Sequence, residues 1–89
     1  MEDKYIKDYL NAMHTLGKIK NVDRMFEVMT QASKNGITLS ADEVNTDDIK
    51  YLYYEADVIY FRYSSNENGF FYLLTNGAWD LIFKVTGKK

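Results

Sequence analysis

The side chains best suited to chemistry lie in the middle of the chain, where carboxylates cluster around a single cation, Lys50. We call this cluster the acidic segment: Asp42, Glu43, Asp47, Asp48, Glu55 and Asp57. Carboxylates can stabilise helix starts, hold a hard cation where their oxygens converge, or dock on a basic partner. The spacing does not establish convergence, so we expect no metal site. A solvated face and a docking surface stay open. Neighbouring tyrosines would add ring contacts to a docking surface: Tyr51, Tyr53, Tyr54 and Tyr60.

The only histidine, His14, is a second candidate for catalysis. General-base catalysis needs a reacting group within hydrogen-bond reach and a group that orients the ring, and no motif around His14 supplies them. Residues 64–69 resemble the start of a calcium loop, but the twelfth position, Thr75, lacks the required bidentate carboxylate. We therefore expect no enzyme activity, no metal and no cofactor.

Composition limits the range of functions further. The 89 residues are 46% hydrophobic and 16% aromatic, enough for one modest core, and we predict a single domain over 1–89. The absence of cysteine excludes disulfides and thiolate chemistry and fits a reducing compartment, so we expect a cytoplasmic protein. A net charge of −2 argues against general nucleic-acid binding, which relies on an excess of cations. No apolar run of about 18 residues is present, so we expect no membrane contact.

Apolar residues at helical spacing predict two helices, over about 4–18 and 21–35. Asn21 is placed to cap the second helix, and Gly36 is placed to end it. The segment from 40 to 56 fits two structures. Ser40 and Glu43 match a capping box, and a second start signal near Thr46 predicts a short turn and then a helix over roughly 46–55. Alternation at positions 49, 51 and 53 also fits a strand. We favour the helix.

The last third of the chain predicts a three-stranded antiparallel β-meander, with strands over about 57–63, 70–75 and 78–86. Asn76-Gly77 tolerates the backbone of a tight hairpin turn, and the register that follows places apolar and aromatic residues on one face. This face holds Ile59, Phe61, Tyr63, Phe70, Tyr72, Leu74, Trp79, Leu81 and Phe83. A shift by one residue would bury Arg62 and Asp80. We therefore predict an α+β fold, with two or three N-terminal helices packed on one face of this sheet.

The opposite side of the predicted sheet is half apolar, and charged residues surround its centre. We call its candidate binding residues the second sheet face: Tyr60, Arg62, Phe71, Leu73 and Ile82. The helices of so short a chain can cover one side of the sheet, so this face is open to a partner, to a second copy of the chain or to another segment of the same chain.

In size, acidity, lack of cysteine and richness in Asn, Lys and Tyr, the chain resembles small accessory proteins of bacteriophages and mobile elements, of which anti-CRISPR proteins are a familiar group. The resemblance is one of composition and carries no motif, so it assigns no family. It implies a non-catalytic inhibitor, in a bacterial cytoplasm, that docks on a host protein or nucleoprotein complex through the acidic segment or the second sheet face. One alternative is a homo-oligomeric assembly module, as a homodimer, that pairs through the second sheet face. The other is a nucleic-acid-binding module.

Overall fold

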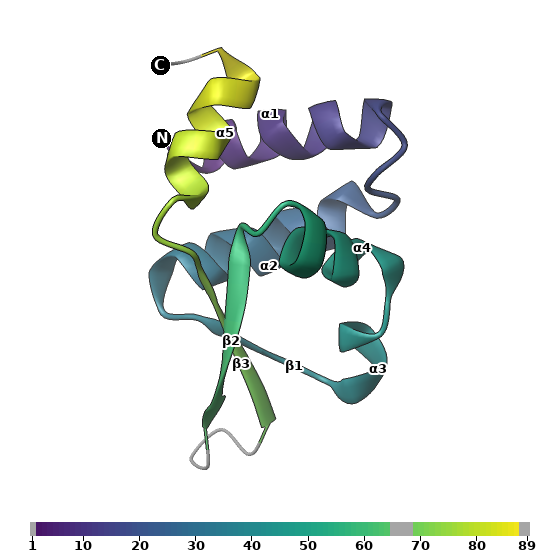
Figure 1. The fold of residues 1–89 in the computed structure, drawn as a ribbon, viewed down its shortest axis with the longest axis vertical. Helices are drawn as coiled ribbons and strands as arrows, with labels where there is room; N and C mark the ends of the chain where they lie inside the picture. The colour runs from purple at the N-terminus through teal and green to yellow at the C-terminus, as the bar shows by residue number, and fades with distance from the viewer. Residues whose placement is uncertain (1, 65–68, 88–89) are drawn as a thin grey trace.

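The computed structural model describes residues 2–64 and 69–87, which form an α+β fold as predicted. Figure 1 shows the elements in order: α1 Glu2–Thr15, α2 Val22–Lys34, β1 Ile37–Leu39, α3 Ala41–Val44, α4 Asp47–Lys50, the π-helix η1 Tyr51–Glu55, β2 Ile59–Ser64, β3 Gly69–Leu74 and α5 Ala78–Thr86.

The first helices and their caps follow the sequence signals. The side chain of Asn21 accepts a hydrogen bond from the backbone of Arg24, and α2 ends two residues before Gly36, whose φ is 92°. The ambiguous segment is helical, as favoured, and it breaks where the second start signal lies. Ser40 caps α3 and Thr46 caps α4, each by accepting a bond from a backbone N–H three residues on.

The sheet is antiparallel with strand order β1-β3-β2. The predicted pairing of the first two strands of the meander is confirmed as β2 with β3, because Ile59 lies opposite Leu74 and Phe61 opposite Tyr72. The third strand is not the predicted one. It is the three-residue β1, which pairs with the other edge of β3 and places Ile37 opposite Tyr72. Three residues carry too little pattern for this strand to be predicted from the sequence.

The prediction of a strand over 78–86, and with it the meander, is wrong: these residues form helix α5. β1 already occupies the edge of β3 that this strand would have used. A short apolar run fits either structure, and here helical spacing decides, because Ala78 and Ile82 are four residues apart and both are buried. Trp79 and Phe83 share the same spacing, with ring centroids 5.6 Å apart, and Phe83 meets Tyr5 of α1 edge-on at 5.3 Å.

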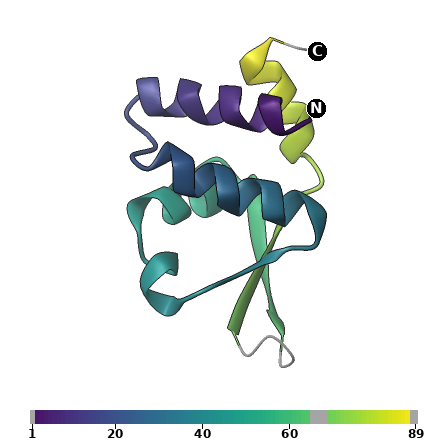
Figure 2. The ribbon, with the colours of Figure 1, turned by 180° about the vertical axis from the view of Figure 1, so that it is seen from behind.

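α2 lies between α1 and the sheet, and α5 packs beside α1 (Figures 1 and 2). The core therefore runs between α1, α2, the α4–η1 segment and one side of the sheet. Its fully buried large side chains are Ile6, Tyr9, Leu10, Ile19, Val28, Met29, Leu39, Ile49, Leu52, Val58, Ile59 and Ile82.

Replacing Gly36 by alanine is expected to lower the free energy of unfolding by about 2–4 kcal/mol. Its φ of 92° disfavours any side chain, and an added Cβ would overlap the ring of Phe71. Gly17→Ala is the matched control, because Gly17 has a φ of 78° but nothing within 4 Å of an added Cβ. Urea denaturation measures both. Equal losses would show that the Phe71 ring moves aside without cost.

Candidate functional site

The acidic segment is divided by the fold. Asp48 is only 6% exposed, and its two carboxylate oxygens accept hydrogen bonds from the backbone N–H groups of Lys20 and Asn21, at 2.9 and 2.8 Å. This carboxylate joins the start of α4 to the loop between α1 and α2. Asp48 therefore has a structural role and is not accessible to a partner.

Two more of these carboxylates pair with cations of the same chain. Glu43 receives two hydrogen bonds from the guanidinium of Arg24, at 2.7 and 2.6 Å, and this hydrogen bonding lowers the pKa of its carboxyl group. The predicted capping box is thus half formed, since the Glu43 side chain turns to Arg24. Asp47 pairs with Lys20 at 3.3 Å, where both side chains are well exposed. Such a surface pair contributes little to stability.

The remaining members, Asp42, Glu55 and Asp57, are exposed and form no ion pair with any described residue. They lie on different elements, at the start of α3, the end of η1 and the turn before β2. Within residues 2–64 and 69–87, no group of three acidic or histidine side chains is placed to hold a metal ion. The acidic segment is therefore not one continuous free surface.

The second sheet face is exposed or half-buried at each predicted member that the sheet contains: Tyr60, Arg62, Phe71 and Leu73. Placing Ile82 on this face is wrong, because Ile82 lies on α5 and is fully buried. Phe71 also has a structural role, since its ring lies against Gly36. Tyr60, Arg62 and Leu73 are therefore the members best placed to meet a partner.

The catalytic candidate His14 and the calcium-like stretch 64–69 are explained by local structure in their described residues. His14 makes a 2.7 Å hydrogen bond through Nδ1 to the carbonyl of Ile19, which closes the loop after α1. Of the calcium-like stretch, Ser64 and Gly69 pair at the ends of β2 and β3, and residues 65–68 lie outside the described part of the chain.

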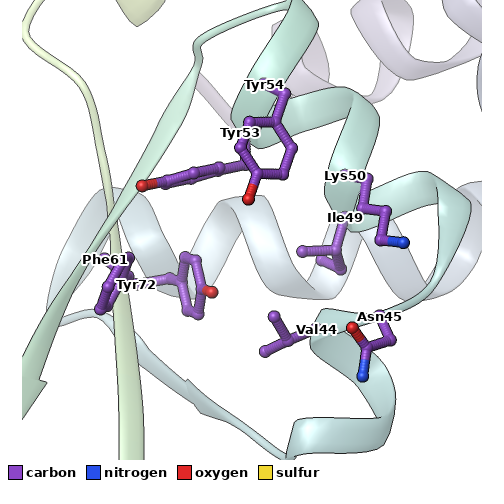
Figure 3. Close-up of a pocket in the computed structure, with 8 residues that line it drawn as sticks. All are labelled: Val44, Asn45, Ile49, Lys50, Tyr53, Tyr54, Phe61 and Tyr72. Atoms are coloured by element: carbon purple, nitrogen blue, oxygen red, sulfur yellow. The ribbon is translucent and has the colours of Figure 1, made fainter.

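A hollow between η1, α3, α4 and the sheet lies on the described surface and was not predicted from the sequence. We call it the aromatic pocket; its volume is about 220 Å³, and Figure 3 shows its lining. Two rings come from η1 and two from the sheet. The aliphatic and polar groups come from α3, α4 and the turn between these helices. The lining residues are Val44, Asn45, Ile49, Lys50, Tyr53, Tyr54, Phe61 and Tyr72.

The four rings of the pocket form one connected cluster. Tyr53 is central: its ring centroid lies 4.8 Å from that of Tyr54, 6.0 Å from Phe61 and 6.3 Å from Tyr72. Tyr54 is 75% exposed and Phe61 is 40% exposed, so apolar ring surface faces solvent. Phe61 was expected in the core; it lies on the inward side of the sheet, but no helix covers it fully. An exposed ring cluster of this kind is typical of interaction sites.

The π-helix η1 places the two tyrosines that form one wall of the pocket. In η1 the backbone N–H of Ala56 donates to the carbonyl of Tyr51, five residues back, at 2.8 Å. Leu52 is buried below while Tyr53 and Tyr54 turn to the pocket side (Figure 3). π-helices are rare and frequently occur at functional sites. In the sequence these tyrosines are neighbours of the acidic segment, but no sequence signal predicts a π-helix and the placement of their rings.

Polar groups complete the pocket at two places. Tyr72 lines the pocket and is almost fully buried; burial, followed by the neighbouring Tyr53 and Tyr54, raises the pKa of its hydroxyl. Lys50 and Asn45 stand together on the side opposite Phe61 (Figure 3). Lys50 forms no ion pair with a described residue, and it is the one charged side chain among the described residues of the lining.

Comparisons of the chain with models of protein families, with curated proteins and with solved structures give no match. None of the helices within the described ranges is both long and apolar enough to cross a membrane. The geometry of the site is therefore the basis for a functional proposal.

Proposed function

We propose that this chain is a non-catalytic protein-binding domain, and that the aromatic pocket and its rim contact the partner. The observation that carries the proposal is the exposed ring surface of Tyr54 and Phe61 beside a preformed hollow. Large exposed rings are enriched in binding surfaces because they bury much apolar area at a small loss of conformational entropy.

The proposal keeps the general function expected from the sequence and changes its location. Docking through the whole acidic segment has little support, because Asp48 holds the α1–α2 loop and Glu43 holds Arg24. Asp42, Glu55 and Asp57 stay available at the periphery. An inhibitor of a host protein, as the compositional resemblance implies, is one form that such a binding domain would take.

Site-specific crosslinking tests the proposal and requires no choice of partner in advance. The photoreactive amino acid p-benzoyl-phenylalanine, placed at position 54, is expected to form a covalent adduct with one predominant protein in an extract of the source cells. Leu16 is the matched control position, because it is also a large exposed apolar residue but lies after α1, outside the pocket. The adducts are identified by mass spectrometry.

The outcomes separate the proposal from its alternatives. Adducts that are equal at positions 54 and 16, or absent at both, would contradict binding through the pocket. A predominant adduct of twice the chain mass would instead support the homo-oligomeric module. A nuclease-sensitive adduct would support the nucleic-acid-binding module.

A further inference from the structure

The size of the aromatic pocket indicates what it can hold. At about 220 Å³ it is smaller than the roughly 300–1,000 Å³ of pockets that enclose a drug-sized ligand. It is suited to one large side chain of a partner protein. Its walls are rings on one side and the aliphatic groups of Val44 and Ile49 on the other (Figure 3).

The ring geometry favours an aromatic occupant. The lining rings already pack edge-on or tilted, with centroid separations between 4.8 and 6.3 Å. An inserted ring can extend this cluster at the same spacing, where aromatic pairs gain energy beyond their buried area. In the view of Figure 3 the hydroxyl of Tyr54 points toward the space between Tyr72 and Ile49.

The positive charge of Lys50 at the pocket rim indicates which type of residue stands next to the aromatic residue in the partner. Lys50 is the charged group at the pocket, and no described carboxylate neutralises it. The nearest carboxylates in sequence, Asp47 and Asp48, are engaged by Lys20 and by backbone N–H groups. A cationic occupant would be repelled here although the rings alone would attract it.

We propose that the aromatic pocket binds an aromatic side chain of a partner protein that is adjacent in sequence to an acidic residue, with the ring among Tyr53, Tyr54, Phe61 and Tyr72 and the carboxylate on Lys50. The assignment rests on the proposed protein-binding function and specifies the recognised chemistry. It reverses the charge expected from the sequence, where an acidic surface of this chain would meet a basic partner.

Three capped dipeptides test this assignment on the full chain: phenylalanine–aspartate, phenylalanine–lysine and alanine–aspartate. Binding is followed by NMR through the methyl groups of Val44 and Ile49, with the buried Val28 methyls of α2 as the internal reference. We expect saturable shifts with phenylalanine–aspartate, none with alanine–aspartate, and about threefold or more weaker binding of phenylalanine–lysine, as one exposed ion pair allows.

Two variants, each with one lysine replaced by glutamate, isolate the contribution of the Lys50 charge to peptide binding. Lys50→Glu is expected to abolish or invert the preference for the aspartate peptide, whereas Lys4→Glu, the same change at an exposed position of α1, is expected to leave it unchanged. Equal binding of both phenylalanine peptides, or no pocket shift with either, would overturn the assignment. Failure of the peptide titration would not change the crosslinking result at position 54. Absence of crosslinked adducts would likewise not change the measured peptide binding. The two proposals can therefore fail separately.

Discussion

Replacing Ile82 by alanine is expected to lower the free energy of unfolding by about 2–5 kcal/mol, a large part of the total stability of a domain this small. Ile82 is fully buried on α5, where the helix packs beside α1. Truncation removes apolar contacts and leaves a cavity that the rigid helix pair fills only in part. Urea denaturation followed by circular dichroism measures the loss.

Leu81→Ala is the informative comparison, because Leu81 is half-buried and lines an open groove between α1, η1 and α5. It is expected to cost about 1 kcal/mol. A β-strand over the same residues would turn Leu81 inward and Ile82 outward, so the two structures give opposite rankings. A larger loss for Leu81→Ala than for Ile82→Ala would contradict helix α5.

Asp48→Ala is expected to destabilise the fold by about 2–4 kcal/mol, because it leaves the backbone N–H groups of Lys20 and Asn21 without their acceptor. Bonds to a charged acceptor are stronger than neutral ones, and both groups lie in a partly buried place. The stability is measured by urea denaturation. Hydrogen exchange at these two amides is expected to be faster than in the unmodified protein, and the increase is expected to exceed that of the amides in the core helices.

Asp47→Ala removes the neighbouring carboxylate and serves as the control. Its pair with Lys20 is well exposed on both sides, so the expected loss is at most about 1 kcal/mol. Equal losses for the two variants would contradict a structural role for Asp48. The comparison also matters for the site, because Asp48 fixes the start of α4, which carries Ile49 and Lys50 of the aromatic pocket.

Local signals in the sequence determined the parts of the fold that depend on neighbouring residues. The caps at Asn21, Ser40 and Thr46 each act within three residues, so helix starts were predictable without tertiary contacts. The register of β2 with β3 was predictable because alternation leaves one pairing that keeps Arg62 out of the apolar side.

Tertiary structure decided what the sequence left ambiguous. The run over 78–86 suits either a strand or a helix. It is helical because β1 occupies the second edge of β3 and α1 packs beside α5, with Tyr5 against Phe83. The aromatic pocket was likewise hidden, since it joins residues of η1 to residues of β2 and β3. Composition determined that this chain is rich in rings; only the packing of distant segments decided which rings face solvent together.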